Sequence, residues 1–175
     1  MLANKVFQST KSTVFHADTL TNALNNNFLE VFKVEDRLDG NPRRTPGKKI
    51  LIKLIRNMGK EFNYTKIFDT CALNPLTVRQ AFTSDNFIVL YLGYPDVEPQ
   101  RKLEEIRKCA KENPYCWSHK FDDGAMLRHI EKFKLASRDI ERQCKETNLI
   151  FYNTSTDFLR VFNRAYSDIM NQLTN

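Results

Sequence analysis

Three features are missing from this 175-residue sequence, and each absence argues against a class of protein. No apolar run approaches the roughly 18 residues needed to cross a bilayer, so a membrane-spanning protein is not indicated. The four cysteines include no CxxC pair, and no basic segment followed by an apolar one opens the chain, which argues against a secreted disulfide scaffold. We therefore expect reduced thiols, a cytoplasmic protein and no membrane partner.

The charge balance is basic, with 27 Lys and Arg against 21 Asp and Glu, for a net charge of +6. The excess is concentrated in NPRRTPGKK, residues 41–49. Such a balance suits an anionic ligand and equally a solvated surface, and it is only a weak indication of nucleic acid. A chain of this length can bury roughly 70% of its unfolded surface. We predict a single domain spanning residues 1–175.

The most informative segment is FIVLYLGYPDVEPQRKLEEIRK, residues 87–108, where an apolar run ends at a Gly and a Pro and a charged helix follows. That order is typical of a strand buried on both faces, a loop at its carboxyl end and a crossover helix, which is where open α/β sheets bind ligands. Three more apolar runs end in Asp, Asn, Thr or Ser, at residues 12–18, 65–71 and 148–155. We therefore expect functional side chains along the rim above a sheet.

Helical periodicity lies between these apolar runs. Candidate helices are residues 20–32, 49–62, 99–111, 123–148 and 157–173, with a short helical or turn segment at 75–82. Residues 35–48 form a charged loop, and residues 113–124 form an aromatic, polar loop that carries Trp117. The alternation of strands and helices predicts a three-layer α/β/α domain with a mostly parallel sheet of four or five strands and right-handed crossovers.

From about residue 12 onward the chain resembles the P-loop kinases of small molecules, the broad group of nucleoside, shikimate, gluconate and adenylate-type kinases. The likeness is carried by VFHAD, IFDTCALNP, FIVLYLGYPD with its helix, NPYCWSHKFDDG where those kinases have a mobile lid, and NLIFYNTSTDF. It implies one kinase-like domain with a lid-like insertion at about residues 112–124. It also implies ATP-dependent phosphoryl transfer to a small-molecule acceptor, with ATP and Mg²⁺ as cofactors.

The phosphate-binding motif of that family, GxxxxGK[ST], does not occur in this sequence. The nearest strings are residues 11–13, with no Gly before them, and residues 40–49, where six residues instead of four separate the two glycines. Residues 1–6 read like the end of the helix that the phosphate loop opens. The chain therefore looks like a truncated kinase that begins after its phosphate loop, and we expect it to be inactive or weak.

In the resembled kinases the first strand is central, between the strands that correspond here to residues 66–70 and 87–92. Its loss would leave a slot of roughly 10 Å, or two strand spacings, with unpaired backbone on both neighbours. We expect the slot to be filled in one of three ways: by direct pairing of the neighbours, by residues 6–8, or by a second chain in a homodimer that completes the sheet.

The resemblance places the acceptor site at the ends of the first two strands. Asp18 would orient the acceptor hydroxyl and take its proton, or it would cap a helix starting near Thr19. Asp69 would lie near Mg²⁺ or the acceptor, or form an Asx-type turn. His16 is assigned no role, and Cys71 is expected to be a small buried residue. The charged loop would bind the acceptor, or remain solvated, through three arginines: Arg37, Arg43 and Arg44.

The nucleotide side of the site would come from the lid and from the last strand. Arg107 would close over the transferring phosphate, and Arg101 and Arg138 flank the same lid-like loop. A helix of mixed charge would show the same arginines. Thr154 belongs to the loop that contacts adenine in the resembled kinases, although capping of the last helix is the favoured role for that loop.

Two other functions stay open. A non-catalytic nucleotide-binding or regulatory module would use the same rim without turnover. A nucleic-acid-binding domain ranks last, because aromatic and basic residues are not interleaved along the sequence, and it would use Arg43, Arg44, Lys48 and Lys49. A zinc site is disfavoured because the spacing C-x6-C-x2-H-x9-H lacks a CxxC knuckle; its ligands would be Cys109, Cys116, His119 and His129.

Overall fold

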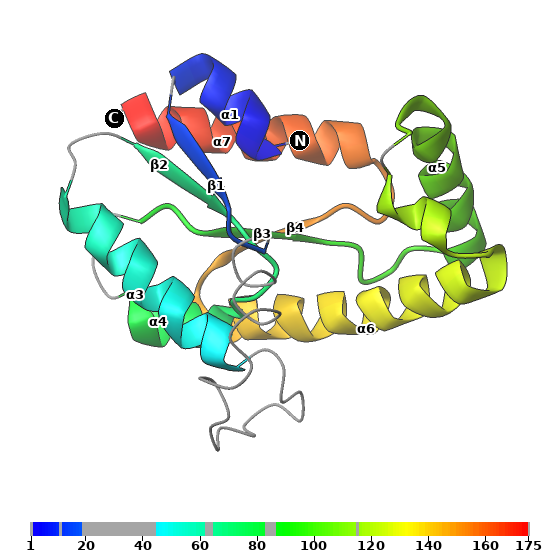
Figure 1. The fold of residues 1–175 in the computed structure, drawn as a ribbon, viewed down its shortest axis with the longest axis horizontal. Helices are drawn as coiled ribbons and strands as arrows, with labels where there is room; N and C mark the ends of the chain where they lie inside the picture. Colours follow the sequence, from blue (N-terminus) through cyan, green and yellow to red (C-terminus); the bar gives the residue numbers. More distant parts are fainter. Residues whose placement is uncertain are drawn as a thin grey trace. The chain divides into compact units, whose positions relative to one another are not determined.

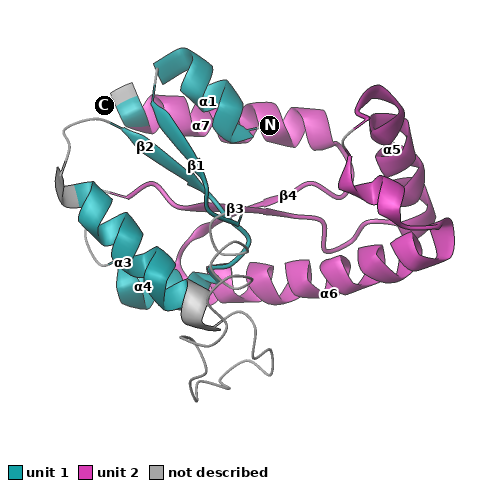
Figure 2. Cartoon of the chain, in the orientation of Figure 1, with its two compact units in different colours: residues 1–83, 173–175 teal, residues 84–172 magenta. Residues whose placement is uncertain are grey.

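The computed structural model describes residues 2–10, 12–18, 45–61, 65–82, 87–114 and 116–174. The chain divides into two compact units, which Figure 2 colours separately: unit 1 holds residues 1–83 and 173–175, and unit 2 holds residues 84–172. Each unit contains its own pair of parallel strands. That residues 1–175 form a single domain stays a prediction.

Unit 1 is built around two short parallel strands (Figure 1). Its elements are α1 (Leu2–Thr10), β1 (Thr13–His16), α3 (Thr45–Glu61), β2 (Lys66–Asp69) and α4 (Pro75–Ala81). The strands pair along their whole length, so that His16 lies opposite Asp69 at the carboxyl end. Phe15 and Phe68 stack across the pair with ring centroids 5.2 Å apart. Helix α1 packs against both strands.

Local sequence explains the helices of unit 1. Oδ1 of Asn74 accepts a 2.9 Å hydrogen bond from the N–H of Thr77, and Pro75 occupies the first turn, so α4 begins there. Helices α1 and α3 each bury two apolar residues four positions apart, as expected of one face of an amphipathic helix. These buried pairs are Leu2 with Val6 and Leu51 with Ile55.

Unit 2 packs a long helix against the second strand pair. Its elements are β3 (Leu90–Gly93), α5 (Pro99–Glu112), the 3-10 helix η1 (Trp117–Lys120), α6 (Asp123–Thr147), β4 (Ile150–Asn153) and residues 158–172 of α7 (Phe158–Thr174). Helix α6 contacts both strands and also α5. The apolar core lies where α5 and α6 meet the loop after β3, and its buried members are Val97, Leu103, Met126 and Ile130.

The close approach of α6 and β4 to β3 requires a glycine at position 93. A Cβ added to Gly93 would lie 2.8 Å from the ring of Phe151 and 2.9 Å from Oγ of Ser137. Helix α6 itself has well-defined ends. Asp122 caps its first turn by accepting a 2.6 Å hydrogen bond from the N–H of Ala125, and Asn148 ends it in the left-handed conformation, with φ of 55°.

The prediction of one three-layer sheet of four or five strands is wrong. Among the described residues the strands form two separate two-stranded sheets, β1–β2 and β3–β4, in a chain that is otherwise mostly helical. No described segment supplies a further strand to either sheet. Residues 6–8 belong to helix α1, because Val6 is buried on its apolar face. That a second chain completes a sheet stays a prediction.

Two further expectations concern parts of the chain outside the strands. The helix predicted at residues 20–32 and residues 35–44 of the charged loop lie outside the described residues. The next helix begins at Thr45, four residues before its predicted start. Within the described ranges, no helix combines the length and the apolar content that crossing a bilayer demands.

Candidate functional site

The carboxyl ends of β1 and β2 bring polar side chains together in unit 1. Asp18 lies just after β1, and its Oδ1 accepts a 2.8 Å hydrogen bond from Oγ1 of Thr70. The backbone N–H of Cys71 donates to both carboxylate oxygens of Asp18, over 3.0 and 3.1 Å. Asp18 therefore ties the end of β1 to the loop that follows β2. The alternative of a helix capped near Thr19 concerns residues outside those described.

His16 and Asp69 form a second pair at this edge. They are directly opposite in the ladder, with Nδ1 of His16 3.3 Å from Oδ2 of Asp69, and their side chains are 55% and 56% exposed. When Nδ1 carries the proton it donates to Asp69, which leaves the lone pair of Nε2 available to a ligand. His16 was not predicted to be a site residue. Its position at the end of a strand, level with Asp69 in a parallel ladder, is the signal that could have identified it.

We call His16, Asp18, Asp69, Thr70 and Cys71 the unit 1 rim. Cys71 was expected to be buried, but it is exposed, because it lies in the loop after β2 rather than in the strand. The three predicted acceptor arginines belong to the charged loop. Arg37, Arg43 and Arg44 lie outside the described residues.

In unit 2 the corresponding strand ends are closed by their own hydrogen bonds. Both the backbone N–H and the Oγ1 of Thr154 donate to the carbonyl oxygen of Gly93, over 2.7 and 2.9 Å. The N–H of Asp96 donates to Oγ of Ser155, and Nδ2 of Asn153 donates to Oδ2 of Asp96, each over 3.0 Å. Thr154 is buried, so its polar groups serve the link between the two strands.

The predicted nucleotide-side arginines are also bonded to the backbone of unit 2. Nη2 of Arg101 donates to the carbonyl oxygen of Thr156 over 2.7 Å. Nε of Arg138 donates to the carbonyl oxygen of Pro95 over 2.9 Å. Both side chains therefore hold loops at the carboxyl ends of β3 and β4.

Arg107 fixes the lid-like segment to helix α5. Its Nε donates to Oδ1 of Asp123 over 2.8 Å, Nη1 to the carbonyl oxygen of Ser118 over 2.9 Å, and Nη2 to the carbonyl oxygen of Phe121 over 2.7 Å. All three nitrogens of the guanidinium group thus have partners within unit 2. Arg107 therefore holds η1 against α5; we call this arrangement the Arg107 clamp.

Among the described residues, the side chains that the resemblance assigns to a magnesium–nucleotide complex have partners within the protein. Within those ranges no group of three or more His, Cys, Asp or Glu side chains is arranged to hold a metal ion. The basic side chains that would meet phosphate donate instead to protein carbonyl groups; they are Arg101, Arg107 and Arg138.

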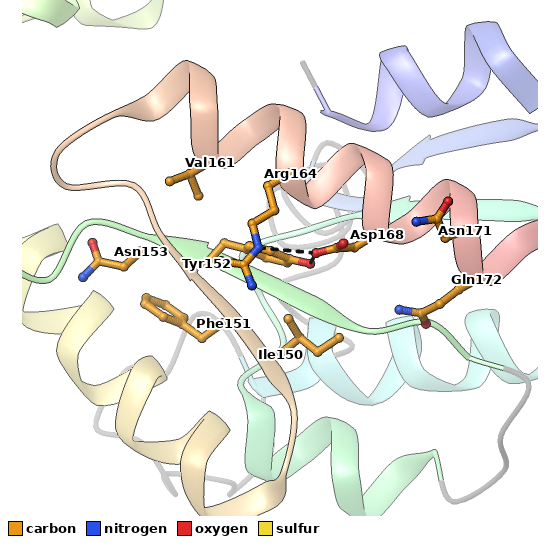
Figure 3. A pocket seen from close by; sticks show the side chains of 9 residues that line it. All are labelled: Ile150, Phe151, Tyr152, Asn153, Val161, Arg164, Asp168, Asn171 and Gln172. Carbon is orange, nitrogen blue, oxygen red and sulfur yellow. Dashed lines mark hydrogen bonds and ion pairs between the residues drawn. The ribbon is translucent and has the colours of Figure 1, made fainter.

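A cavity of about 630 Å³ lies along β4 and α7 in unit 2 (Figure 3). The hydroxyl of Tyr152 donates a 2.6 Å hydrogen bond to Oδ2 of Asp168, and Nε of Arg164 lies 3.8 Å from the same oxygen. Burial, reinforced by the hydrogen bond to Asp168, raises the pKa of Tyr152 to about 12. The remaining lining residues are Ile150, Phe151, Asn153, Val161, Asn171 and Gln172.

This cavity was not predicted from the sequence, because only the apolar stripe of the last helix was used to interpret that helix. The signal was the spacing of Arg164 and Asp168, which are four residues apart and therefore lie on one face of α7. Three comparisons with known proteins found no match: no family model, no curated protein and no solved structure. The case for a function therefore comes from the residues themselves.

Proposed function

We propose that this chain is a non-catalytic binding or regulatory relative of the small-molecule kinases, and that it binds a small hydroxylated ligand at the unit 1 rim. The observation that carries the proposal is the meeting of two carboxylates and an imidazole at the carboxyl ends of two parallel strands. Carboxylate oxygens and an imidazole lone pair accept hydrogen bonds from hydroxyl groups. Strand ends of this kind are where parallel α/β sheets bind ligands.

The proposed absence of turnover is supported by the state of the groups that would stabilise a transferring phosphate. The sequence has no GxxxxGK[ST] motif, and Arg107 is hydrogen-bonded through all three guanidinium nitrogens. Loss of a single preorganised donor lowers a catalytic rate on the order of 10²- to 10³-fold. Phosphoryl transfer by a parent kinase stays a prediction from the resemblance.

Calorimetry with ATP, together with an assay of phosphate transfer, distinguishes a catalytic protein from a non-catalytic one. We expect ATP with Mg²⁺ to give weak or no heat of binding, and no transfer of the γ-phosphate to nucleosides, gluconate or shikimate. Micromolar binding of ATP together with transfer would show that the chain is a working kinase. If the nucleotide binds without transfer of its γ-phosphate, the ligand of the proposed binding module is a nucleotide and not a hydroxylated compound.

The rim itself is tested by titrating the isotope-labelled protein with the same hydroxylated compounds and following amide chemical shifts. Signals of residues 16–18 and 69–71 should move first. Asp69→Asn should weaken binding, because the amide places a donor where the carboxylate accepts. Glu104→Gln is the matched control, since it removes another exposed carboxylate from α5. Equal affinities of both variants, or an unchanged rim at saturating ligand, would contradict the proposal.

A further inference from the structure

Four aromatic rings form a continuous surface where η1 meets α6 in unit 2. Trp117 packs edge-on against Phe121 and Phe133, with centroid distances of 5.8 and 6.5 Å. His129 lies between the two phenylalanines, 4.6 Å from the ring of Phe121 and 6.1 Å from that of Phe133. We call these residues the ring surface. Trp117 is 50% exposed and Phe133 is 40% exposed, so both side chains remain substantially open to solvent.

The ring surface borders the core of unit 2, because Phe121 packs against that core. His129 and Phe133 lie four residues apart, on one face of α6. The residues of α6 that enter the core are Met126 and Ile130, both fully buried. Trp117 and Phe133 are not among the buried members of that core, and both keep much of their surface exposed. An exposed group of large apolar side chains, unlike a single exposed residue, is informative about binding.

Two lysines flank these rings. Lys120 follows Trp117 by three residues in a 3-10 helix, where such residues are aligned, and Lys132 follows His129 by three residues on α6. Both are exposed, and the ammonium group of neither forms an ion pair or a hydrogen bond with any residue that the structure describes. Each lysine is therefore available to an anion.

The acidic residues of the same segment are already engaged. Asp122 caps α6 through the N–H of Ala125, and Asp123 pairs with Arg107 at 2.8 Å. Glu131 lies 3.8 Å from Nζ of Lys134. The segment thus presents exposed rings beside cations that have no acidic partner among the described residues, and it is complementary to a ligand that is both aromatic and anionic.

We infer that the ring surface binds single-stranded nucleic acid. Bases would stack on Trp117 and Phe133, while Lys120 and Lys132 contact the phosphates. A single strand carries a flat ring and a negative charge in every nucleotide, so it matches both features. An acidic peptide matches the lysines alone. The inference rests on unit 2 and does not depend on the ligand of the unit 1 rim.

The chain offers an internal reporter, because Trp117 is its one tryptophan. A short oligothymidylate or oligouridylate should quench the fluorescence of Trp117 on binding, and rising salt should weaken the complex. Heparin is the matched polyanion without bases. Binding of heparin with no quenching, alongside quenching by the oligonucleotides, supports the inference. Absence of oligonucleotide binding, or binding without any change in tryptophan fluorescence, overturns it.

Variants separate stacking from charge, with affinity measured by the anisotropy of a labelled oligonucleotide. Trp117→Leu should weaken binding roughly 5- to 150-fold, as expected for the loss of one stacked base, whereas Trp117→Phe should retain most of the affinity. Phe133→Leu gives an independent second test. Circular dichroism confirms that each variant is folded, and equal affinities of Trp117→Leu and Trp117→Phe would overturn the stacking role.

The lysines are tested as a pair against a variant with the same net charge. K120Q/K132Q should lower the affinity and reduce the slope of log affinity against log salt by about 1.4, since each phosphate contact to a single strand contributes about 0.7. K145Q/R160Q removes two exposed cations elsewhere in unit 2 and should leave the slope unchanged. If the two double variants change the affinity and the salt slope equally, the attraction is non-specific electrostatics and the inference is wrong.

Discussion

The hydroxyl of Tyr152 on β4 donates a 2.6 Å hydrogen bond to Oδ2 of Asp168 on α7. Tyr152 is buried, with 6% of its surface exposed, whereas the side chain of Asp168 is 40% exposed. The pair therefore joins the strand to the helix at the wall of the cavity in unit 2, as Figure 3 shows. Its strength depends on the phenol keeping its proton.

Alkaline pH should weaken this link. The pKa of Tyr152 is raised to about 12 in the folded protein, from 10.0, so the stabilisation is complete below pH 10 and is lost as the pH rises towards 12. Urea unfolding at pH 8 and at pH 11 measures the loss. Tyr152→Phe cannot ionise, and its free energy of unfolding should fall less over this interval. Identical losses in the two proteins would contradict the prediction.

Gly93→Ala should destabilise unit 2, because the new methyl group would overlap the ring of Phe151 and Oγ of Ser137. Overpacking of this kind costs about 1–3 kcal/mol. Gly124→Ala is the matched control. Its Cβ would lie no closer than 3.5 Å to a neighbour, and alanine favours the helix by up to about 1 kcal/mol. Urea denaturation should therefore show shifts of opposite sign for the two variants.

Arg107→Ala should release η1 from α5. The carbonyl groups of Ser118 and Phe121 would each lose a charged donor, at a cost of about 2 kcal/mol in the free energy of unfolding. Arg107→Lys should not restore stability, since an ammonium group cannot reproduce the planar fork. The emission of Trp117, inside η1, reports the local change. Arg142→Ala removes exposed ion pairs from α6 and should leave both readouts nearly unchanged.

Cys116 should react with iodoacetamide before Cys144 in the folded protein. Hydrogen bonds from Ser118, helped by the charge of Arg107, lower the pKa of the Cys116 thiol, whereas burial raises that of Cys144 to about 11. More thiolate is therefore present on Cys116 near neutral pH. Peptide mapping by mass spectrometry gives the order of labelling. Ser118→Ala should slow Cys116 relative to the exposed Cys109, and an unchanged ratio would refute the cause.

The positions of the helices and strands could be predicted because their signals are local. Residues 123–148 were predicted to be a helix, and α6 spans Asp123–Thr147, with a capping aspartate before it and an asparagine after it. Helix α5 begins at Pro99, where Glu98 caps the first turn through the N–H groups of Gln100 and Arg101. Hydrophobic spacing and caps lie within a few residues of one another, so the sequence contains the information directly.

The sheet could not be predicted in the same way, because an apolar run does not record which other strand will pair with it. The four runs gave the correct strands, yet their joining in one sheet was predicted from the alternation of strands and helices, and the described strands form two separate pairs. Pairing depends on non-local contacts between backbone edges.

The candidate sites show a similar limit. Asp18 and Asp69 could be found because each ends an apolar run. The ring surface could not, because Trp117 and Phe133 are 16 residues apart and meet only after η1 is fixed against α6. The bonds of Arg107 are equally hidden from the sequence, in which an arginine of a lid and an arginine that binds carbonyl groups look alike.

The three hydrogen bonds of Arg107 affect the binding of any ligand that contacts the indole of Trp117. The guanidinium group of Arg107 already fixes the backbone on both sides of Lys120, at Ser118 and Phe121. The backbone of η1 therefore loses little conformational entropy when a partner binds. Loss of the Arg107 hydrogen bonds should therefore change the rate of dissociation of the partner more than its rate of association.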